Sequence, residues 1–364
     1  MRLKKELVDL AGCQHGGRSQ EAARRLGIDE SSLIDFSVSL NPLPGIDPRE
    51  AVRRAYRSIF SYPDNGYDKF RESAARFAGV EAENIIPGNG SMEIIRLIAE
   101  AAVERGDTVT IPCPTFGEYE RQCRAFGAVV RRLPLESLVA RDLGGLDGSR
   151  MAFFCNPNNP DGRLLPGQAV ERMIKYCGER GIIAVVDEAF IDLADPAQSV
   201  AGLAEEYDNL LVLRSLTKCF AIPGLRLGFG IAGKATARVL NEARLTWNLD
   251  GLAAEVGVYY MDNAGPLLKA SRAFIKKERE LLTGRMGRID GISPQSSDAN
   301  YFIADVGGTG MSAAGLAEKM LEERVIVRDC ASFGLPRHVR LAVRAREDNE
   351  RLAEALEKVA GVGH

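Results

Sequence analysis

Three segments of the sequence combine residue types that can do chemistry, and each follows a run predicted to form a strand. The segments are Cys155–Gly162 (CNPNNPDG), Val186–Phe190 (VDEAF) and Arg214–Lys218 (RSLTK). A lysine such as Lys218 forms a Schiff base with an aldehyde once its surroundings lower its pKa toward neutrality. A carboxylate such as Asp187, at the end of an apolar strand, keeps a heterocyclic nitrogen protonated so that the ring accepts electrons. Together the two residues predict catalysis with pyridoxal phosphate, a phosphorylated pyridine aldehyde.

The same cofactor needs donors for its phosphate and contacts for its ring. Hydroxyls, a guanidinium and the free N–H groups at a helix N-terminus all suit a phosphate. An asparagine can donate to the ring hydroxyl, and an aromatic side chain can stack on the ring. The expected phosphate donors are Gly90, Ser91, Met92, Ser215, Thr217 and Arg226, and the expected ring contacts are Asn159 and Phe116.

The order and spacing of these motifs separate them from chance matches. A Gly-Asn-Gly-Ser sequence before a helix is more often a turn and a cap, and Asn-Pro-Asn-Asn-Pro alone is usually a turn. Here the motifs lie at successive predicted strand ends, where open α/β sheets bind ligands. The spacings are 28 residues from Asn159 to Asp187 and 31 from Asp187 to Lys218. We therefore interpret the motifs as one site.

Helical and strand patterns alternate from Tyr67 to Ile231, which predicts an α/β fold with a mostly parallel sheet covered by helices. Apolar strands are expected at residues 85–86, 108–111, 151–155, 181–186, 210–213 and 227–231, with helices at 67–78, 91–104, 118–126 and 168–180. After Trp247 a long charged helix and further short strands predict a smaller α+β domain. We expect residues 1–45 to pack on that small domain, 46–247 to form the large cofactor-binding domain and 248–364 to form the small domain.

Composition argues against several other classes of protein. A formal net charge of −3 over 364 residues gives no electrostatic reason to expect nucleic acid or an anionic membrane as a partner. No apolar run is long enough for a membrane span, and the first residues lack the apolar run of a signal peptide. Seven scattered cysteines suit reduced thiols in a cytoplasm, and three histidines without ligand spacing predict no metal site. The expectation is a soluble cytoplasmic enzyme.

On these motifs the sequence resembles fold-type I pyridoxal-phosphate enzymes of the class I and II aminotransferase superfamily over essentially its whole length. Within the superfamily it is similar to histidinol-phosphate aminotransferases and to threonine-phosphate decarboxylase of cobalamin biosynthesis. The resemblance implies a transferase-like fold with a large and a small domain, and a homodimer with active sites at the subunit interface. It also implies that Tyr62 binds the cofactor phosphate of the neighbouring subunit, although a tyrosine before Pro63 would by itself predict only a turn.

Four features resemble the decarboxylase more than the aminotransferase. His15 and its two following glycines match the decarboxylase's amino-terminal pattern, whose histidine lies near the substrate phosphate, and Arg328 lies in a matching Val-Arg-Asp-Cys sequence. Phe190 stands where aminotransferases usually place a tyrosine, and Arg344 stands where histidinol-phosphate aminotransferases typically carry glycine. Plainer interpretations exist: His15 as a surface histidine, Phe190 as a packing residue and Arg344 as a solvated charge.

The resemblance also indicates how a phosphorylated substrate is held. On a strand, Arg340 and Arg344 point to the same face, so with Arg328 they form a cationic pocket for a dianionic phosphate. Ser39 occupies a position where some decarboxylases have an asparagine that touches the substrate, and its hydroxyl reaches less far. The expected substrate-binding residues are His15, Ser39, Asn159, Arg328, Arg340 and Arg344.

The resulting hypothesis is a lyase that decarboxylates L-threonine O-3-phosphate to (R)-1-aminopropan-2-ol O-phosphate. A phosphate clamped on one side leaves the carboxylate perpendicular to the cofactor ring, and that geometry favours loss of CO₂. The alternatives are a decarboxylase of phosphoserine and a histidinol-phosphate aminotransferase using 2-oxoglutarate. A regulatory or binding protein with the same fold is a further alternative, against which the complete residue set and the absence of a basic helix-turn-helix pattern both argue.

Overall fold

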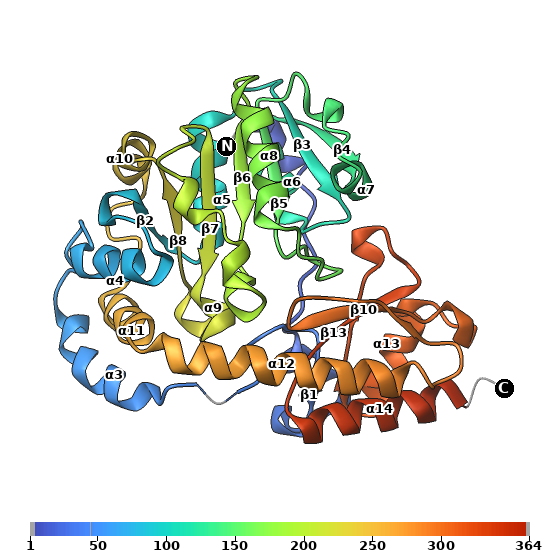
Figure 1. Ribbon diagram of the computed structural model, residues 1–364. Helices are drawn as coiled ribbons and strands as arrows, with labels where there is room; N and C mark the ends of the chain where they lie inside the picture. Colours follow the sequence, from blue (N-terminus) through green and yellow to red (C-terminus); the bar gives the residue numbers. More distant parts are fainter. Residues whose placement is uncertain (1–3, 44, 362–364) are drawn as a thin grey trace. The chain divides into compact units, whose positions relative to one another are not determined.

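The computed structural model describes residues 4–43 and 45–361, which divide into two compact units (Figure 1). Unit 1 contains the chain up to Cys13, Gly45–Pro157 and Leu165–Lys269. Unit 2 contains residues 14–43, Asn158–Leu164 and the chain from Ala270 onward. Each unit has its own sheet and is described by itself.

The centre of unit 1 is a seven-stranded sheet with the order β2-β8-β7-β6-β5-β3-β4. The strands from β7 to β4 in that order are parallel, whereas β8 runs antiparallel to both of its neighbours. The fold class expected from the alternating pattern is therefore confirmed. The strand bounds are β2 Ile85–Asn89, β3 Thr108–Cys113, β4 Val129–Pro134, β5 Met151–Cys155, β6 Ile183–Asp187, β7 Leu210–Ser215 and β8 Leu227–Ala232.

Helices lie on both sides of this sheet, with α8 drawn in front of it and α5 behind it (Figure 1). Apolar residues from alternate positions of β3, β5, β6 and β7 pack with α5 and α6 in one core cluster. Asp47 caps α3 and Asp250 caps α11 through their side chains. The helices are α1 Lys5–Val8, α3 Pro48–Ala55, α4 Asp68–Ala78, α5 Ser91–Ala102, α6 Glu118–Ala125, α7 Leu135–Val139, α8 Gly167–Gly178, α9 Leu216–Cys219, α10 Lys234–Ala243 and α11 Gly251–Asp262.

Unit 2 has a four-stranded sheet of order β12-β13-β10-β9, in which all neighbours are antiparallel, and a separate parallel pair of β1 with β11. Its core gathers apolar residues of these strands with α12, α13 and α14. The strands are β1 Ile34–Asp35, β9 Ser293–Pro294, β10 Tyr301–Asp305, β11 Val325–Ile326, β12 Arg328–Asp329 and β13 His338–Ala342. The helices are α2 Ser19–Leu26, α13 Ala313–Glu322 and α14 Arg346–Gly361, and α12 Ala264–Met286 begins in unit 1 and continues into unit 2.

The division differs in three places from the domains expected at residues 1–45, 46–247 and 248–364. The chain passes to unit 2 at Ala270 and not near 247, because α11 packs on α3 and α4, and Tyr260 donates a hydrogen bond to Ile46 O at 2.8 Å. The Asn158–Leu164 loop belongs to unit 2. Residues 14–43 lie in unit 2, whereas the chain up to Cys13 lies in unit 1, and residues 1–3 and 44 are outside the described residues.

Several elements escaped the sequence patterns. Strand β4 carries Arg131 and Arg132 and is exposed at a sheet edge, where charged residues are common and alternation is weak. Helices α10 and α11 lie in a stretch for which no element was expected. Within residues 4–43 and 45–361, no helix has both the length and the apolarity needed to cross a membrane.

Candidate active site

The carboxylate of Asp187 is fixed at the end of β6 in unit 1. Tyr119, the second residue of α6, donates a hydrogen bond from its hydroxyl to Asp187 Oδ2 at 2.6 Å. The backbone N–H of Ala189 donates to the other oxygen, Oδ1, at 3.0 Å. Asp187 is 4% exposed, so this carboxylate lies inside the protein with one donor on each oxygen.

Two opposing influences act on the charge of this carboxylate. Burial raises the pKa of Asp187, because a charged group loses its hydration in the interior. The hydrogen bonds from Tyr119 and Ala189 and the positive charge of Lys218 lower the pKa of Asp187. The arrangement suits a carboxylate that stays ionised once a cation approaches it.

Lys218 lies in the short helix α9, directly after β7, and its surroundings carry hydroxyl groups and an aromatic ring. Ser215 Oγ and Thr217 Oγ1 are 2.8 Å apart and both residues are buried. The Lys218 ammonium lies 5.9 Å from the centre of the Phe190 ring. The structure thus brings Lys218, Ser215, Thr217 and Phe190 of unit 1 into one neighbourhood, as their strand-end positions predicted.

The start of α5 lies against the ends of β8 and β7. Gly228 of β8 pairs with Gly88 of β2 on one side and with Ser215 of β7 on the other. A Cβ at Gly228 would lie 2.6 Å from the backbone N of Ser91, so only glycine permits this approach. The N–H groups at the start of α5 and the Ser215 hydroxyl therefore belong to one part of unit 1.

Arg226 lies at the same place. Gly90 has φ 74°, and a Cβ there would lie 2.8 Å from Arg226 Nη2. Arg226 itself has φ 52° and donates from Nη1 to Pro223 O at 3.1 Å. The helix N-terminus, the two hydroxyls and this guanidinium together form a set of donors suited to a phosphate.

Aromatic rings surround the tyrosine that contacts Asp187. Tyr119 stacks on Phe153 with ring centres 4.7 Å apart, and Phe116 meets it edge-on at 5.5 Å. Phe116 is partly buried and follows β3 by a short loop. Its stacking on a cofactor ring stays a prediction.

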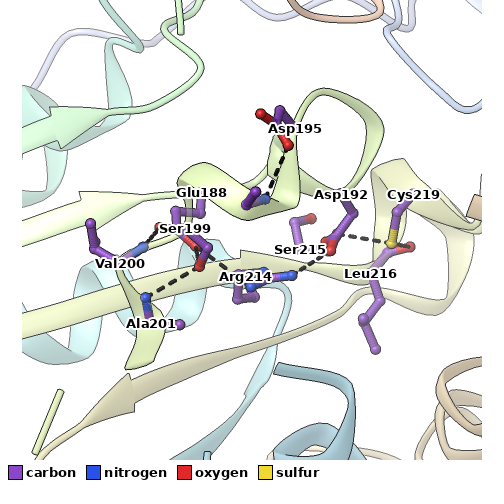
Figure 2. Close-up of polar contacts among 11 residues, drawn as sticks. Glu188, Asp192, Asp195, Ser199, Val200, Ala201, Arg214, Ser215, Leu216 and Cys219 are labelled. Atoms are coloured by element: carbon purple, nitrogen blue, oxygen red, sulfur yellow. Dashed lines mark hydrogen bonds and ion pairs between the residues drawn. The ribbon is translucent and has the colours of Figure 1, made fainter. Parts of the chain in front are cut away.

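A buried charged cluster surrounds Arg214 of β7 (Figure 2). Arg214 is paired with Asp192 and with Glu188, whose Oε2 is 3.5 Å from Nη1. Ser199 Oγ and the N–H of Val200 donate to Glu188 at 2.6 and 2.7 Å. Arg214 and Ser215 are neighbours along β7 and face opposite sides, so Arg214 points away from the side on which Ser215 contacts Thr217.

Tyr62 lies in an exposed aromatic pair of unit 1. Its ring stacks on that of Trp247 with centres 4.1 Å apart, and it is 77% exposed. Tyr56 and Phe60 meet edge-on at 5.5 Å and are exposed as well. Tyr62 therefore presents its side chain to the surface of the chain.

Unit 2 gathers most of the residues expected to bind substrate. Arg340, on β13, donates from Nη2 to Ser37 O at 2.8 Å and from Nη1 to Asn159 Oδ1. It is 7% exposed, and its Nε has no hydrogen-bond partner among the described residues. Asn159, expected on the cofactor ring and on the substrate, is thus placed in unit 2. Its loop is tied there, because Tyr301 donates to Asn158 O at 3.0 Å.

Arg328 lies opposite Arg340 as its antiparallel partner on β12. Its guanidinium donates to Gln14 O at 3.0 Å and to Ser332 Oγ at 2.7 Å, which places it beside the residue that precedes His15. His15 itself is exposed. The two arginines and the His15 segment are therefore neighbours in unit 2.

The two glycines after His15 pack on Ser37. Gly17 N donates to Ser37 Oγ at 3.0 Å, and a Cβ at Gly16 would lie 2.4 Å from Ser37 O. Ser39, two residues further on, is 2% exposed, and its hydroxyl has no partner among the described residues. A buried hydroxyl of this kind costs free energy unless a ligand or a water molecule forms a hydrogen bond with it.

Arg344 has different contacts from those predicted. It lies two residues beyond the end of β13. Its Nε is 2.8 Å from Asp348 Oδ2, and its Nη1 donates to Asp35 O at 3.2 Å. The structure therefore does not bring Arg344 into contact with the two other arginines.

Comparisons with known proteins identify the family. The family model described as aminotransferase class I and II matches residues 32–359. The chain belongs to this family. A histidinol-phosphate aminotransferase of Symbiobacterium thermophilum is 31% identical over 353 residues, which is 94% of each chain.

Solved structures support the same fold. The histidinol-phosphate aminotransferase of Clostridium acetobutylicum superposes with a TM-score of 0.80 at 27% identity and covers 91% of this chain and 100% of its own. The L-threonine-O-3-phosphate decarboxylase of Porphyromonas gingivalis has a TM-score of 0.81 at 24% identity, with 90% and 99% covered. At that identity the decarboxylase shows the fold alone.

The cofactor of class I and II aminotransferases is pyridoxal phosphate, and the residues of unit 1 fit it. A phosphate requires several converging donors, and the start of α5, Ser215, Thr217 and Arg226 supply them. A pyridine nitrogen that must stay protonated requires a buried carboxylate, and Asp187 is one. The Schiff base requires a lysine close to both, and Lys218 contributes to the electrostatics of Asp187.

Sequence reasoning missed Tyr119, Gly228 and the Arg214 cluster. Tyr119 follows Phe116 by three residues at a helix start, a spacing that places both side chains on neighbouring faces. Gly228 lies inside a predicted strand, where glycine often marks a close backbone approach. Glu188 and Arg214 directly flank Asp187 and Ser215, but nothing in the sequence indicates that they pair.

Proposed function

We propose that the protein decarboxylates L-threonine O-3-phosphate to (R)-1-aminopropan-2-ol O-phosphate, with pyridoxal phosphate bound covalently to Lys218. The observation that carries the proposal is the cluster in unit 2, where the His15-Gly16-Gly17 segment packs on Ser37 beside Arg328 and Arg340. The His15 segment and Arg328 belong to two of the four features through which the sequence resembles the decarboxylase. Their contacts with one another support a shared role in binding a phosphate.

Bound pyridoxal phosphate supplies an electron sink for the bond that breaks at the substrate Cα. The start of α5, Ser215, Thr217 and Arg226 bind the phosphate of the cofactor, and Asp187 holds its ring nitrogen protonated. Lys218 anchors the cofactor and delivers a proton to Cα after CO₂ has left.

The substrate phosphate is assigned to Arg340, Arg328 and His15, with Ser39 and Asn159 as neutral partners. Arg340 is buried, donates only to neutral oxygens and has an Nε without a partner among the described residues. A dianionic phosphate would complete its hydrogen bonds and neutralise its charge. We assign Arg344 a secondary role, because its guanidinium is already paired with Asp348.

Phe190 supports decarboxylation over amino transfer. Its buried ring faces the Lys218 ammonium and offers no hydroxyl, unlike the tyrosine usual in aminotransferases. The cofactor's ring oxygen therefore receives no phenol hydrogen bond from this position.

Histidinol-phosphate aminotransferase is the second candidate, because the relatives at about 30% identity carry that name. Such an enzyme also binds a phosphorylated amine, so the arginines alone do not distinguish the two. The products distinguish the two enzymes, because a decarboxylase releases CO₂, whereas an aminotransferase passes the amino group to a 2-oxo acid.

The deciding experiment incubates the purified, cofactor-loaded protein with each substrate. We expect CO₂ release from threonine phosphate with no 2-oxo acid formed. Glutamate formed from 2-oxoglutarate and histidinol phosphate, without CO₂ release from threonine phosphate, would assign the aminotransferase function. Serine phosphate is assayed in parallel with wild type and Ser39→Asn, because Ser39 is where some decarboxylases carry an asparagine that reaches further. If wild type prefers serine phosphate, the substrate is phosphoserine.

The protein is further proposed to act as a homodimer in the cytoplasm. Two exposed aromatic pairs, Tyr56 with Phe60 and Tyr62 with Trp247, support a contact with a second copy, since exposed aromatic side chains are enriched at interfaces. In that assembly Tyr62 would reach the cofactor phosphate of the neighbouring subunit. Among the described residues no cysteine forms a disulfide, which is consistent with a reducing compartment.

A further inference from the structure

Tyr119 has no part in the chemistry proposed above, yet its hydroxyl contacts the central carboxylate. The residue is fully buried in unit 1, and its Oη is 2.6 Å from Asp187 Oδ2. A short O–H···O⁻ hydrogen bond is one of the stronger interactions that an uncharged side chain can make with a carboxylate.

The ring of Tyr119 is held in place from two sides. Phe153 of β5 stacks on it with an angle of 12° between the planes, and Phe116 contacts it edge-on at 80°. A side chain packed in this way cannot swing its hydroxyl away from Asp187 without disturbing the core cluster to which it belongs.

The proton of this hydrogen bond stays on the tyrosine. Burial and the charge of Asp187 raise the pKa of Tyr119 well above its ordinary value, so the phenol remains a donor. With the N–H of Ala189 on the other oxygen, Asp187 receives one donor on Oδ2 and one on Oδ1. Two donors on different oxygens fix the plane of a carboxylate and favour its charged form.

We propose that Tyr119 is a positioning residue for pyridoxal phosphate, which holds the Asp187 carboxylate ionised and oriented toward the ring nitrogen of the cofactor. The proposal rests on the assignment of Asp187 to that nitrogen under the proposed function. It does not depend on whether the reaction is decarboxylation or amino transfer, because both require a protonated ring.

The test compares Tyr119→Phe with wild type in cofactor affinity as a function of pH. Removal of the Tyr119 hydroxyl raises the pKa of Asp187. The pH below which the affinity for pyridoxal phosphate falls must therefore be higher in the variant. At neutral pH we expect cofactor binding to weaken about tenfold or more, the scale of a hydrogen bond to a charged group. Tyr67→Phe is the matched control, since Tyr67 is also buried in unit 1 but donates to a backbone carbonyl, Leu249 O, at 2.9 Å.

A double-mutant cycle separates positioning from general packing. In an Asp187→Asn background, Tyr119→Phe should produce no further loss of affinity, because there is no carboxylate left to hold. If Tyr119→Phe folds poorly by circular dichroism, 3-fluorotyrosine at position 119 replaces it. Because 3-fluorotyrosine is a stronger hydrogen-bond donor, cofactor affinity must then begin to fall only at a lower pH than in wild type.

Three results overturn the inference. The first is a Tyr119→Phe protein whose cofactor affinity falls at the same acidic pH as in wild type. The others are a loss of affinity on Tyr119→Phe that is equally large in the Asp187→Asn background, and a pH dependence that 3-fluorotyrosine leaves unchanged. A wild-type protein that binds no cofactor at Lys218 would instead defeat the proposed function. The two failures are therefore distinguishable.

Discussion

Arg340 carries a positive charge into the interior of unit 2, where, among the described residues, its hydrogen bonds go to the neutral oxygens of Asn159 and Ser37. Burial lowers the pKa of Arg340, because keeping the guanidinium charged in the interior costs free energy. A buried charge without a carboxylate partner is costly for folding, so it is retained most readily where a ligand supplies the opposite charge. We interpret Arg340 as the main anchor of the substrate phosphate.

Arg340→Met is predicted to leave the folded protein as stable as wild type or more stable, because it removes an incompletely paired buried charge. The KM for the phosphorylated substrate should rise about tenfold or more, as expected for a lost charge-assisted hydrogen bond. Steady-state kinetics and thermal unfolding measure the two effects. The matched control is Arg337→Met in the same unit, since Arg337 is 65% exposed and pairs with Asp305. An unchanged KM in Arg340→Met would remove this residue from the substrate site.

At this scale the sequence predicted types of chemistry better than contacts. Ser215, Thr217 and Lys218 lie at the end of β7, and Arg226 directly precedes β8, the antiparallel neighbour of β7, so all four belong to one part of unit 1. Tyr119 could not be predicted, because its contact with Asp187 depends on how α6 packs on the sheet. Arg344 was predicted to join Arg340 in the phosphate pocket, but its guanidinium is paired with Asp348, a contact that the spacing does not reveal, and its role in binding substrate stays a prediction.

A buried cluster of Arg214, Glu188 and Asp192 joins the ends of β6 and β7. Glu188 directly follows Asp187, and Arg214 directly precedes Ser215. Arg214→Met leaves two carboxylates buried without their cation and should destabilise the protein by about 3–5 kcal/mol. Arg76→Met is the control: its pair with Asp262 is exposed, and its loss should cost about 0–1 kcal/mol. Chemical unfolding of both variants tests the difference.

The loss of unfolding free energy in Arg214→Met, called the deficit below, should depend on pH. Burial raises the pKa of Glu188, and the charge of Arg214 opposes that rise. Without Arg214 the pKa of Glu188 rises further, and a carboxyl with a raised pKa in the folded state loses stability as pH increases. The deficit should therefore be smallest below the ordinary pKa of glutamate and grow as the pH rises through the raised value. A deficit independent of pH would contradict this account of the cluster.

The start of α5 gives a second prediction for an element. Gly90→Ala should weaken cofactor binding, because a Cβ at Gly90 would displace the Arg226 guanidinium. Gly79→Ala is the control, since Gly79 also has φ 74° but no heavy atom lies within 4 Å of a Cβ built there. Gly79 has ψ 38°, in the left-handed α region, whereas Gly90 has ψ 162°, where alanine is strained more, so cofactor affinity is compared only between variants that are folded. Equal cofactor affinity in the two would exclude Arg226 and α5 from the phosphate site.

Elements with strong apolar runs were predicted well, and those without were not. The strand Met151–Cys155 matches its prediction residue for residue, because an uninterrupted apolar run in a buried strand leaves no alternative. Strand β4 was missed because an exposed edge strand tolerates Arg131 and Arg132. Boundaries of the helices predicted between residues 67 and 180 shifted by a residue or two, as terminal turns and caps decide them.

For the whole molecule, the sequence predicted two parts but located the boundary too early. The predicted boundary followed a change in character after Trp247, whereas the division follows packing: α11 covers α3 and α4 of unit 1. The Asn158–Leu164 loop joins unit 2 through contacts with Ser297, Asp298 and Tyr301 that no local pattern reveals. Long-range packing of this kind cannot be read from motif spacing.

The two exposed aromatic pairs predict the assembly. Trp247→Ser and Phe60→Ser should convert a dimer to a monomer and reduce retention of the cofactor, because Tyr62 then no longer reaches a neighbouring site. Val239→Ser is the control, since Val239 is also exposed but lies on α10, outside these pairs. Analytical ultracentrifugation and cofactor content measure both effects. A wild-type protein that is monomeric and fully active would contradict the assembly.

The central claim is that Lys218 carries the cofactor, and one measurement tests it directly. Purified protein loaded with pyridoxal phosphate is reduced with borohydride, digested and analysed by mass spectrometry. The account predicts a phosphopyridoxyl group on Lys218, its absence after Lys218→Ala, and loss of the visible absorbance of the cofactor in that variant. A modified lysine at another position, or no modified lysine in an active protein, would contradict it.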